Sequence, residues 1–598
     1  MENKKQAIIL SGVAIVALLA LIIGATYAYF RASGNSGSNT DINVTTYTLD
    51  LLSFEMGSDI KINADQTSFA SGKGNATGST FAKAILTANN KTNTATKNYY
   101  MYLNISNNTF TYTQNENTPE LLLTITDVSG NAITSITGLT YKTVIDGKGT
   151  SVSGFDITTK SGLLTLFDNR EITASPTKTE EWNVTVTFVN YNVNQTGNAG
   201  KSFNAKLMIQ QEEYELTLAD ICAGKTLSDC VISQYTGTQG DNALYYHNST
   251  LTNGAGDNSY RYAGGDYVLT EAGKATGATM MIGYNNSVTT ALIDFYCNGT
   301  KQYVGYASSC STSHYYLIKG DTTQYQTYNE ALNASVEKGY LTKDNVKNFV
   351  CFGSDATTCP TENLYRIIGV FNNHVKLIKY DYAKSSLLGT DGDFSQEYTS
   401  NYFSGEQGES PSSNSLYYWN NAGTNTWSAS KLNTVNLNTN FTTNIGTAWA
   451  NKIATTTWKV GGGTYANLRD AVPKTAYQYE VGSSASTTTY DAKIGLMYVS
   501  DYYYSASPSA WTLVGYNSDY TKSYASAKGE NWLYGGGWDW TISRNSDFSD
   551  RAFYVGSSGG VDDLSVDDGN GVRPSFSLLS STTYVSGSGS MSDPVRIN

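Results

Sequence analysis

The sequence predicts a mainly β, multidomain protein with an N-terminal transmembrane or signal helix, a β-sandwich domain and a C-terminal α+β domain. Three observations lead to this prediction. A long apolar run lies near the N-terminus, apolar and polar residues alternate repeatedly from residue 44 onwards, and helix-like periods appear only in the later part. Because 598 residues exceed what one hydrophobic core supports, several domains are expected.

The composition is that of an extracellular β protein. The chain has 46 Tyr and 55 Gly but only 8 Pro, and 15% of its residues are charged. Many tyrosines and few charges are less typical of cytosolic enzymes or disordered tails. The net charge of −12 and the lack of a basic stripe argue against nucleic acid as a partner, because phosphate binding needs clustered Lys or Arg.

Residues 1–30 predict a signal peptide or a membrane anchor. Residues 7–29 are almost wholly apolar and long enough to span a bilayer, and Lys4 and Lys5 place the N-terminal end in the cytoplasm. Residues 26–28 also fit cleavage by a signal peptidase, so retention and removal both stay open. Residues 31–43, rich in Ser, Gly and Asn, predict a linker to a chain that lies outside the cell.

Residues 44–213 predict a β-sandwich. In one segment Trp182, Val184 and Phe188 alternate with polar residues, which is the pattern of a strand with one buried face. Several such strands pack as two face-to-face sheets, for which a structural or spacing role is the simplest function. Strand-like segments are found at residues 99–105, 120–128, 163–167 and 181–189.

Two segments of this part resemble the biofilm-fibre and camelysin-like secreted β-sandwich proteins of Gram-positive bacteria. G-A-T-Y-A-Y-F at residues 24–30 is similar to the end of their signal peptides, and A-G-K-S-F-N-A-K-L-M-I-Q-Q at 199–211 is similar to their last strand. The resemblance implies export, with processing by a dedicated peptidase.

Residues 214–350 are predicted to be a connecting region with a cysteine-containing insertion. A short helix is expected around Leu218, and a longer one over residues 329–338. His247 lies among tyrosines and has no carboxylate or cysteine at a useful spacing. It is therefore expected to be a packing residue and not a ligand or a base.

The six cysteines fall into three local pairs. In an exported chain, an even number at short spacings predicts disulfides, each stabilising by about 2–3 kcal/mol. Zinc is the alternative, but it is opposed by the lack of a C-x-x-C pair and by the presence of only three histidines. The expected disulfides are Cys222–Cys230, Cys297–Cys310 and Cys351–Cys359.

Residues 351–598 predict the C-terminal α+β domain. A β-hairpin is expected over residues 364–380, because two apolar strands flank an Asn-Asn turn. A helix is expected over residues 441–453, where apolar residues recur every fourth position, with Asn440 as its N-cap. Residues 490–504 are expected to form a strand.

The stretch from 531 to 578 carries a second resemblance. W-D-W-T at 538–541, S-R at 543–544, A-F-Y-V at 552–555 and G-V-R-P at 571–574 resemble the closing part of the C-type-lectin fold. The nearest variant is that of the formylglycine-generating (sulfatase-modifying) family, and the variable proteins of diversity-generating retroelements share the scaffold. The resemblance implies a C-type-lectin-like domain and places five residues at scaffold positions: Trp540, Arg544, Phe553, Arg573 and Pro574.

The same stretch departs from the functional members of these families. No cysteine follows Cys359, so the thiols of the oxidative enzymes are missing. The E-P-N, Q-P-D and W-N-D triplets with which calcium-dependent lectins hold their ion and sugar are missing as well. The resemblance therefore implies a binding scaffold without either activity.

Aromatic and short polar residues around these strands predict a ligand-binding surface. Tyr and Trp offer large rigid areas for stacking on sugars or proteins, and Asn and Asp add adaptable hydrogen bonds. For Trp538 a core position is the alternative. The expected binding residues are Trp532, Tyr534, Trp538, Asn545, Asp547, Asp550, Tyr554, Asp562, Asp563, Asp567 and Asn570.

No catalytic residue, metal site or cofactor is predicted. The acidic pairs at 562–563 and 567–568 leave calcium open, but their spacing matches no standard calcium loop, and exposed acidic turns are common. The glycine triplets at 461–463 and 535–537 lack the Lys-Ser/Thr of a phosphate loop and are expected to be turns or close backbone contacts.

Together these patterns predict an exported, adhesin-like cell-surface protein, either membrane-anchored or secreted. Its partners would be the membrane, through the N-terminal helix, and an extracellular protein or glycan bound by the C-terminal domain. A structural subunit of a surface fibre or biofilm matrix is the alternative. A sulfatase-modifying enzyme is opposed by the missing cysteines. Diversification of the loops at 545–570 is a further hypothesis that applies to the adhesin-like protein.

Overall fold

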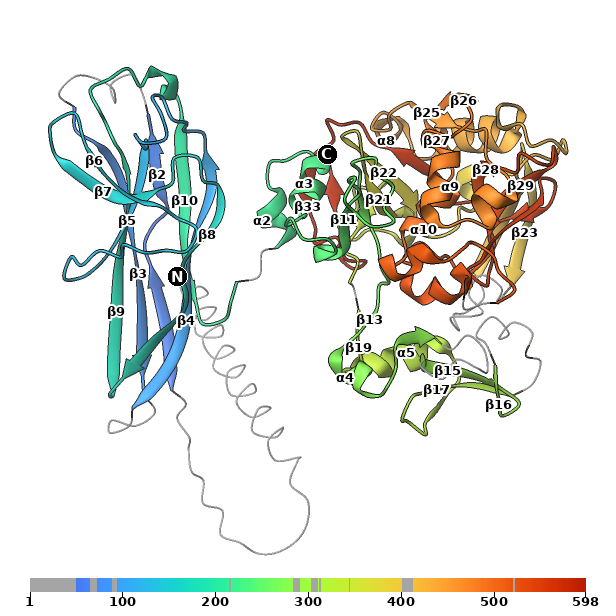
Figure 1. The fold of residues 1–598 in the computed structure, drawn as a ribbon, viewed down its shortest axis with the longest axis horizontal. Helices are drawn as coiled ribbons and strands as arrows, with labels where there is room; N and C mark the ends of the chain where they lie inside the picture. Colours follow the sequence, from blue (N-terminus) through green and yellow to red (C-terminus); the bar gives the residue numbers. More distant parts are fainter. Residues whose placement is uncertain are drawn as a thin grey trace, which may run out of the picture. The chain divides into compact units, whose positions relative to one another are not determined.

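The computed structural model describes residues 50–64, 73–88, 94–214, 217–282, 291–302, 310, 313–343, 345–400, 412–519 and 522–598. The predicted N-terminal helix and the linker at 31–43 lie outside these residues. Among the described residues, no helix is long and apolar enough to cross a membrane. The chain divides into two compact units, Met1–Tyr214 and Glu215–Asn598 (Figure 1).

The N-terminal unit consists of two antiparallel sheets around one core, in a sandwich-like arrangement (Figure 1). The larger sheet has the strand order β1-β3-β9-β5-β7-β6, and the smaller has the order β2-β10-β4-β8. The strands are β1 Leu51–Met56, β2 Ile60–Asn63, β3 Ala76–Thr87, β4 Ala95–Asn108, β5 Leu121–Asp127, β6 Tyr141–Ile145, β7 Ser151–Asp156, β8 Gly162–Ala174, β9 Thr177–Phe188 and β10 Ser202–Gln210.

The alternating pattern of β9 is confirmed. Trp182, Val184 and Phe188 are buried in the core between the sheets, as the sequence predicts for a strand with one apolar face. The indole Nε1 of Trp182 donates to the hydroxyl of Tyr99 at 2.9 Å, and this hydroxyl donates to Glu180 at 2.7 Å. The polar ends of the buried aromatic side chains are therefore satisfied.

The C-terminal unit is built around a seven-stranded sheet with the order β11-β12-β21-β22-β32-β27, in which β20 also pairs with β21. The predicted hairpin is confirmed as β21 and β22. The sheet extends across the predicted boundary at residue 351, because β11, β12 and β20 begin before it. Its strands are β11 Leu244–Tyr246, β12 Tyr260–Tyr262, β20 Phe349–Cys351, β21 Leu364–Phe371, β22 His374–Lys379, β27 Ile494–Gly495 and β32 Ser575–Ser577.

Four smaller sheets and several short helices complete the main body of this unit (Figure 1). The sheets are β23 Phe394–Ser400 with β24 Ser412–Tyr418 and β31 Gly569–Asn570, β25 Thr456–Lys459 with β26 Thr489–Ala492, β28 Asp539–Arg544 with β29 Arg551–Val555 and β30 Val561–Ser565, and β33 Tyr584–Ser586 with β34 Arg596–Ile597. The α-helices are α2 Leu218–Cys222, α3 Leu227–Ser233, α6 Ser385–Leu388, α7 Thr442–Asn444, α8 Thr447–Ala450, α9 Pro473–Glu480 and α10 Val499–Tyr504.

Two local predictions for this body are wrong. The helix expected over 441–453 begins earlier, as a π-helix at Leu432–Phe441, and a glycine at 446 with φ 83° separates α7 from α8. Asn440 is no N-cap, because it lies within the π-helix, and its amide donates to Leu388 O and Asp391 Oδ1. The strand expected over 490–504 ends at Gly495, and its tyrosine-rich part forms α10. In both places tertiary packing outweighs the local pattern.

The described residues between 266 and 343 form a small lobe with its own core. The helix predicted at 329–338 is confirmed as α5, which begins with a capping box between Thr327 and Glu330. The elements of the lobe are β13 Val268–Leu269, α4 Glu271–Ala275, β14 Met280–Ile282, β15 Ala291–Cys297, β16 Thr300–Gln302, β17 His314–Ile318, β18 Gln324–Tyr325, α5 Tyr328–Glu337 and β19 Leu341–Thr342.

The three predicted disulfides are confirmed. Cys222 bonds to Cys230 between α2 and α3, Cys297 bonds to Cys310 in the small lobe, and Cys351 bonds to Cys359 beside the first strands of the sheet. The described residues contain no free cysteine. Each bridge closes a short loop and so restricts the unfolded chain locally.

The stretch from 531 to 578 is more deeply buried at β28 than its alternating pattern predicts. Trp540 is fully buried in the main core, but Asp539, Thr541 and Ser543 on the other face of β28 are buried as well. Trp538 lies just before the strand and is 36% exposed. Among the other predicted scaffold residues, Phe553, Arg573 and Pro574 are buried and Arg544 is half-buried.

Trp540 and Trp538 provide a test of this packing. We expect Trp540→Ala to lower the free energy of unfolding of the C-terminal unit by about 3–5 kcal/mol, because it leaves a large cavity. Trp538→Ala, at the edge of the core, is expected to cost about 1 kcal/mol or less. Urea unfolding followed by tryptophan fluorescence measures both, and equal losses would contradict the assigned core.

Candidate functional site

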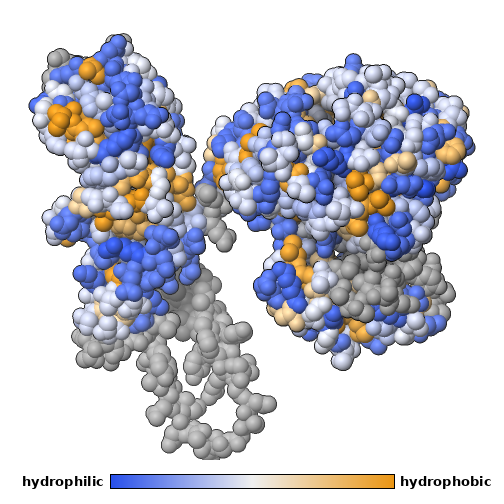
Figure 2. All heavy atoms as spheres, viewed as in Figure 1, coloured by the Kyte–Doolittle hydropathy of each residue, from blue (hydrophilic) through white to orange (hydrophobic). Residues whose placement is uncertain are grey.

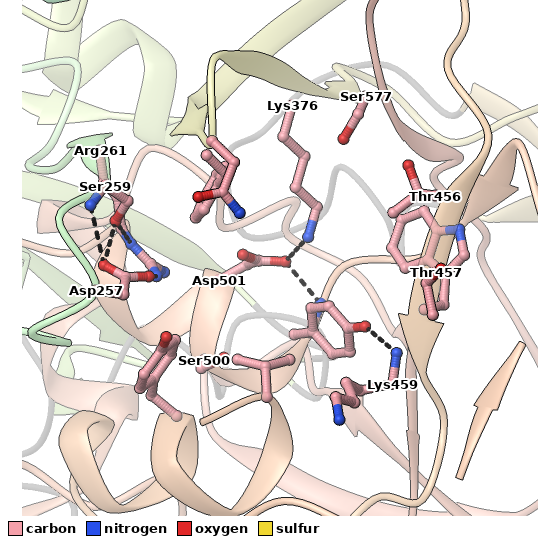
Figure 3. Close-up of a pocket in the computed structure, with 16 residues that line it drawn as sticks. Asp257, Ser259, Arg261, Lys376, Thr456, Thr457, Lys459, Ser500, Asp501 and Ser577 are labelled. Carbon is pink, nitrogen blue, oxygen red and sulfur yellow. Dashed lines mark hydrogen bonds and ion pairs between the residues drawn. The ribbon is translucent and has the colours of Figure 1, made fainter. Parts of the chain in front are cut away.

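A pocket of about 290 Å³ lies in the C-terminal unit, at one face of the seven-stranded sheet (Figure 3). Its walls come from β12, β22 and β32 of that sheet and from β25, α9 and α10. These elements are distant in sequence and meet only in the folded unit. The volume suits a ligand of the size of one sugar or one amino acid, at the lower end of small-molecule sites.

The floor of the pocket is a buried ion pair. Lys376 Nζ on β22 lies 2.5 Å from Asp501 Oδ2 on α10, and the two side chains are only 8% and 3% exposed. The same Asp501 oxygen accepts the backbone N–H of Tyr498 at 2.8 Å. Asp501 therefore caps the first turn of α10 while it neutralises Lys376. The Lys376 ammonium also lies over the ring of Tyr498, 4.6 Å from its centroid.

A second ion pair lies in the wall. Arg261 on β12 donates through Nη2 to Asp257 Oδ2 at 2.6 Å and through Nε to Ser259 Oγ at 2.8 Å. Burial by itself would raise the pKa of Asp257, but the Arg261 charge and hydrogen bonds from Ser259 outweigh burial and lower it to about 2. Asp257 is therefore a carboxylate throughout the physiological pH range.

A buried glutamate holds the start of α10 in place. Glu480, the last residue of α9, accepts the backbone N–H groups of Val499 at 2.9 Å and Ser500 at 2.8 Å, and the hydroxyl of Ser543. Burial raises the pKa of the Glu480 carboxyl. These contacts join α9, α10 and β28, so the position of Asp501 depends on all three elements.

Aromatic rings and hydroxyl groups form the rest of the lining. Phe371 and Tyr477 contribute their rings, and the Tyr498 hydroxyl is held by the backbone N–H of Lys459 at 2.8 Å. Thr456 and Ser577 place hydroxyl groups at the rim, on the Lys376 side of the pocket in Figure 3, whereas the Thr457 hydroxyl donates to Asp491 on β26 at 2.6 Å. Aromatic faces beside polar donors and acceptors are the chemistry of polar-ligand recognition.

Four of the five charged groups of this pocket form two ion pairs, and the fifth is Lys459. Lys376 and Arg261 each have a carboxylate partner, and among the described residues no group of three His, Cys, Asp or Glu is placed to hold a metal ion. Paired charges on a rigid wall orient a bound ligand.

A second pocket, of about 440 Å³, lies beside the Cys351–Cys359 loop, Trp449 and the last strand, β34. Its charged lining residues, Asp355, Asp593 and Arg596, are exposed or half-exposed. Because solvent competes for such groups, this pocket is the weaker candidate for specific binding.

The predicted binding residues lie elsewhere in the unit and in more than one place. Asp547, Asp550 and Asp567 are exposed on turns, and Asp562 is half-buried and pairs with Arg469 at 3.1 Å. A second group surrounds the β28–β29 pair: Trp538 lies 6.1 Å from Tyr554 between ring centroids, and Tyr534 donates to Ser557 O.

Four of the predicted binding residues are buried, which corrects the prediction that they form part of an exposed surface. Trp532 donates to Tyr262 O at 2.8 Å from within the core, and Asn570 is fully buried. Asn545 donates to Asp563 Oδ2 at 2.8 Å, and Asp563 also accepts from Arg551 at 3.2 Å. The Asn545, Asp563 and Arg551 side chains therefore satisfy one another. The Asn570 amide, in contrast, has no hydrogen-bond partner among the described residues. His247, in contrast, is confirmed as a packing residue between Tyr504 and Trp511.

None of the pocket residues was predicted as a site. The available signal was a charged residue at an inward position of an otherwise apolar strand: Arg261 between two tyrosines and Lys376 between Val375 and Leu377. Such residues are seldom buried unless they are paired. Asp257 lies only four positions before its partner Arg261, but Asp501 cannot be identified from sequence spacing, because it is 125 positions from Lys376.

The sequence was compared with protein-family models and with curated proteins. No protein-family model matches the chain, and no curated protein matches its sequence.

The pKa of Asp257 gives a pH-dependent prediction. Its value is about 2 in the folded protein against 3.8 for an ordinary carboxyl, so its stabilising effect is full above pH 4 and is lost as the pH falls through 2. We expect the stability deficit of Asp257→Asn to shrink by about 2 kcal/mol between pH 5 and pH 2. Urea titrations at several pH values measure it, with Asp550→Asn as the exposed control; a deficit independent of pH would contradict the assignment.

Proposed function

We propose that this chain is an exported, adhesin-like cell-surface protein whose C-terminal unit binds a glycan through the pocket that contains Lys376 and Asp501. The supporting observation is the lining of that pocket, in which aromatic rings lie beside hydroxyl groups and internally paired charges. A protein ligand that inserts one side chain is the second partner class within this proposal.

Size and chemistry both support a sugar unit as the ligand. A volume of about 290 Å³ admits one ring but not a long apolar molecule. Sugars present one apolar face, which suits Tyr477 or Phe371, and several hydroxyl groups, which suit Asp501 and the rim residues. Since the site lies on rigid elements, little ordering entropy is lost on binding.

The remaining parts of the proposal come from the sequence. The C-terminal unit is proposed to be C-type-lectin-like, and residues 1–30 are proposed to export the chain and to serve as its anchor or signal peptide. Three disulfides support an oxidising compartment outside the cytoplasm. The sandwich would then carry the binding unit away from the membrane.

Filling the pocket tests the function. Thr456 is partly exposed at the pocket rim on β25, on the same face of the strand as Trp458, whose ring lies under the Lys376 ammonium. We expect Thr456→Trp to weaken glycan binding by the full-length protein about tenfold or more, because the indole occupies the cavity. Binding to a glycan array with a dilution series measures the effect.

The matched control is Thr489→Trp on β26, the neighbouring strand of the same two-stranded sheet. Thr489 is exposed but does not line the pocket. If both variants lose binding equally, or if neither does, the pocket is not the glycan site.

The structural-subunit alternative is favoured by apolar side chains at the edges of the sandwich. β1 and β6 are the two edge strands of the six-stranded sheet, and Leu51, Met56 and Ile145 on them are between 45% and 63% exposed. Edge strands with exposed apolar residues promote pairing between chains. Elsewhere, the face of the protein in Figure 2 shows apolar residues in small patches separated by polar ones.

This alternative has its own test. If copies assemble through these edges, the full-length protein is expected to sediment as larger species with rising concentration, and Ile145→Lys is expected to reduce this assembly several-fold by placing a charge on the edge. A chain that stays monomeric at every concentration would rule out the fibre subunit without affecting the adhesin proposal.

A further inference from the structure

Two nearly buried cations in the pocket have hydrogen-bond donors without partners. Arg261 is 2% exposed and uses Nε and Nη2, while among the described residues Nη1 has no hydrogen-bond partner. Lys376 is 7% exposed, and the described chain offers its ammonium one hydrogen bond, to Asp501. An ammonium carries three donors and a guanidinium five, so both groups retain donor capacity.

These donors converge on one region. The Phe371 ring lies 4.7 Å from the Arg261 guanidinium carbon and 5.9 Å from the Lys376 ammonium, measured to its centroid, and the Asp501 charge acts on Arg261 as well as on Lys376. Figure 3 shows Lys376 bonded to Asp501 and Arg261 bonded to Asp257, with both pairs in the pocket lining. A group bound between the two pairs would face both cations.

The charge balance of the lining favours an anion with one negative charge. Three basic side chains, Arg261, Lys376 and Lys459, and two acidic ones, Asp257 and Asp501, line the pocket. One positive charge is therefore in excess among the lining residues, while the buried Glu480 carboxyl, whose pKa is raised by burial, lies directly behind Ser500. A single carboxylate is therefore the largest negative charge that the site would balance. A doubly charged phosphate is less favourable, because two carboxylates lie nearby and repulsion is strong in a buried site.

We propose that the pocket selects an acidic sugar, whose carboxylate accepts hydrogen bonds from Arg261 Nη1 and Lys376 Nζ while its ring packs on the aromatic wall. This inference rests on the proposed function and specifies its ligand class. Donation from two cations makes charge-assisted hydrogen bonds, which are stronger than those to a neutral hydroxyl. The rim hydroxyl groups of Thr456 and Ser577 would contact the sugar hydroxyls.

The test compares each acidic glycan with its own methyl ester. The full-length protein is applied to an array of glucuronic-acid-terminated and sialic-acid-terminated glycans, their methyl esters, matched neutral glycans and sulfated glycans. We expect esterification to weaken binding about ten- to a hundredfold, because it removes the charge but keeps the ring and its hydroxyl groups.

A double variant assigns the preference to the pocket. Lys376→Gln with Asp501→Asn removes both charges together and so avoids an unpaired buried charge. The preference for acid over ester is expected to fall about tenfold in this variant and to persist in the control Thr489→Trp. If the double variant does not fold, the ratio of acid binding to ester binding by the unmodified protein still tests whether the ligand is an acidic sugar.

The possible outcomes separate this inference from the function on which it rests. Equal binding of acids and esters, or a preference for neutral or sulfated glycans, would overturn the acidic-sugar inference and leave glycan binding intact. A preference for acids that the double variant retains would place the acid-binding site elsewhere and also overturn it. If a folded protein bound no glycan, the proposed function and the inference would both be rejected.

Discussion

The need to pair buried charges organises the C-terminal unit. Four of the six buried cations among the described residues of this unit, Arg261, Arg366, Lys376 and Arg573, each contact a carboxylate at 2.5 to 2.7 Å; the others are Lys379 and Lys528. Three of these pairs join segments that lie far apart in the chain, since the partners of Arg366, Lys376 and Arg573 are 100, 125 and 34 positions away. At any of these sites, an unpaired charge would lower the stability by roughly several kcal/mol, which is the cost of removing it from water.

This constraint links the fold to the pocket. The Lys376–Asp501 pair holds α10 against the central sheet, and Glu480 and Ser543 hold the start of α10 from the other side. The same groups that fix these elements then form the floor of the cavity, so the site is as rigid as the core around it. Recognition of a polar ligand benefits from such rigidity, because the polar groups are already oriented.

Several features follow from local sequence alone. The strands of the sandwich are predicted by alternation such as that of Trp182, Val184 and Phe188, because one face of each strand must be buried. The disulfides are predicted by short spacing, and α5 by its capping residues Thr327 and Glu330. Each of these patterns depends on residues within about a dozen positions, where local geometry decides the outcome.

The pocket itself depends on contacts that no local pattern encodes. The sequence by itself determined a mainly β chain with paired cysteines and a tryptophan-rich closing stretch, because alternation and spacing act over short distances. Only the tertiary structure decided that Asn545, Asp563 and Asn570 are interior, that residues 499–504 are helical, and that Lys376 meets Asp501. The physical reason is that burial and ion pairing depend on which segments meet in space.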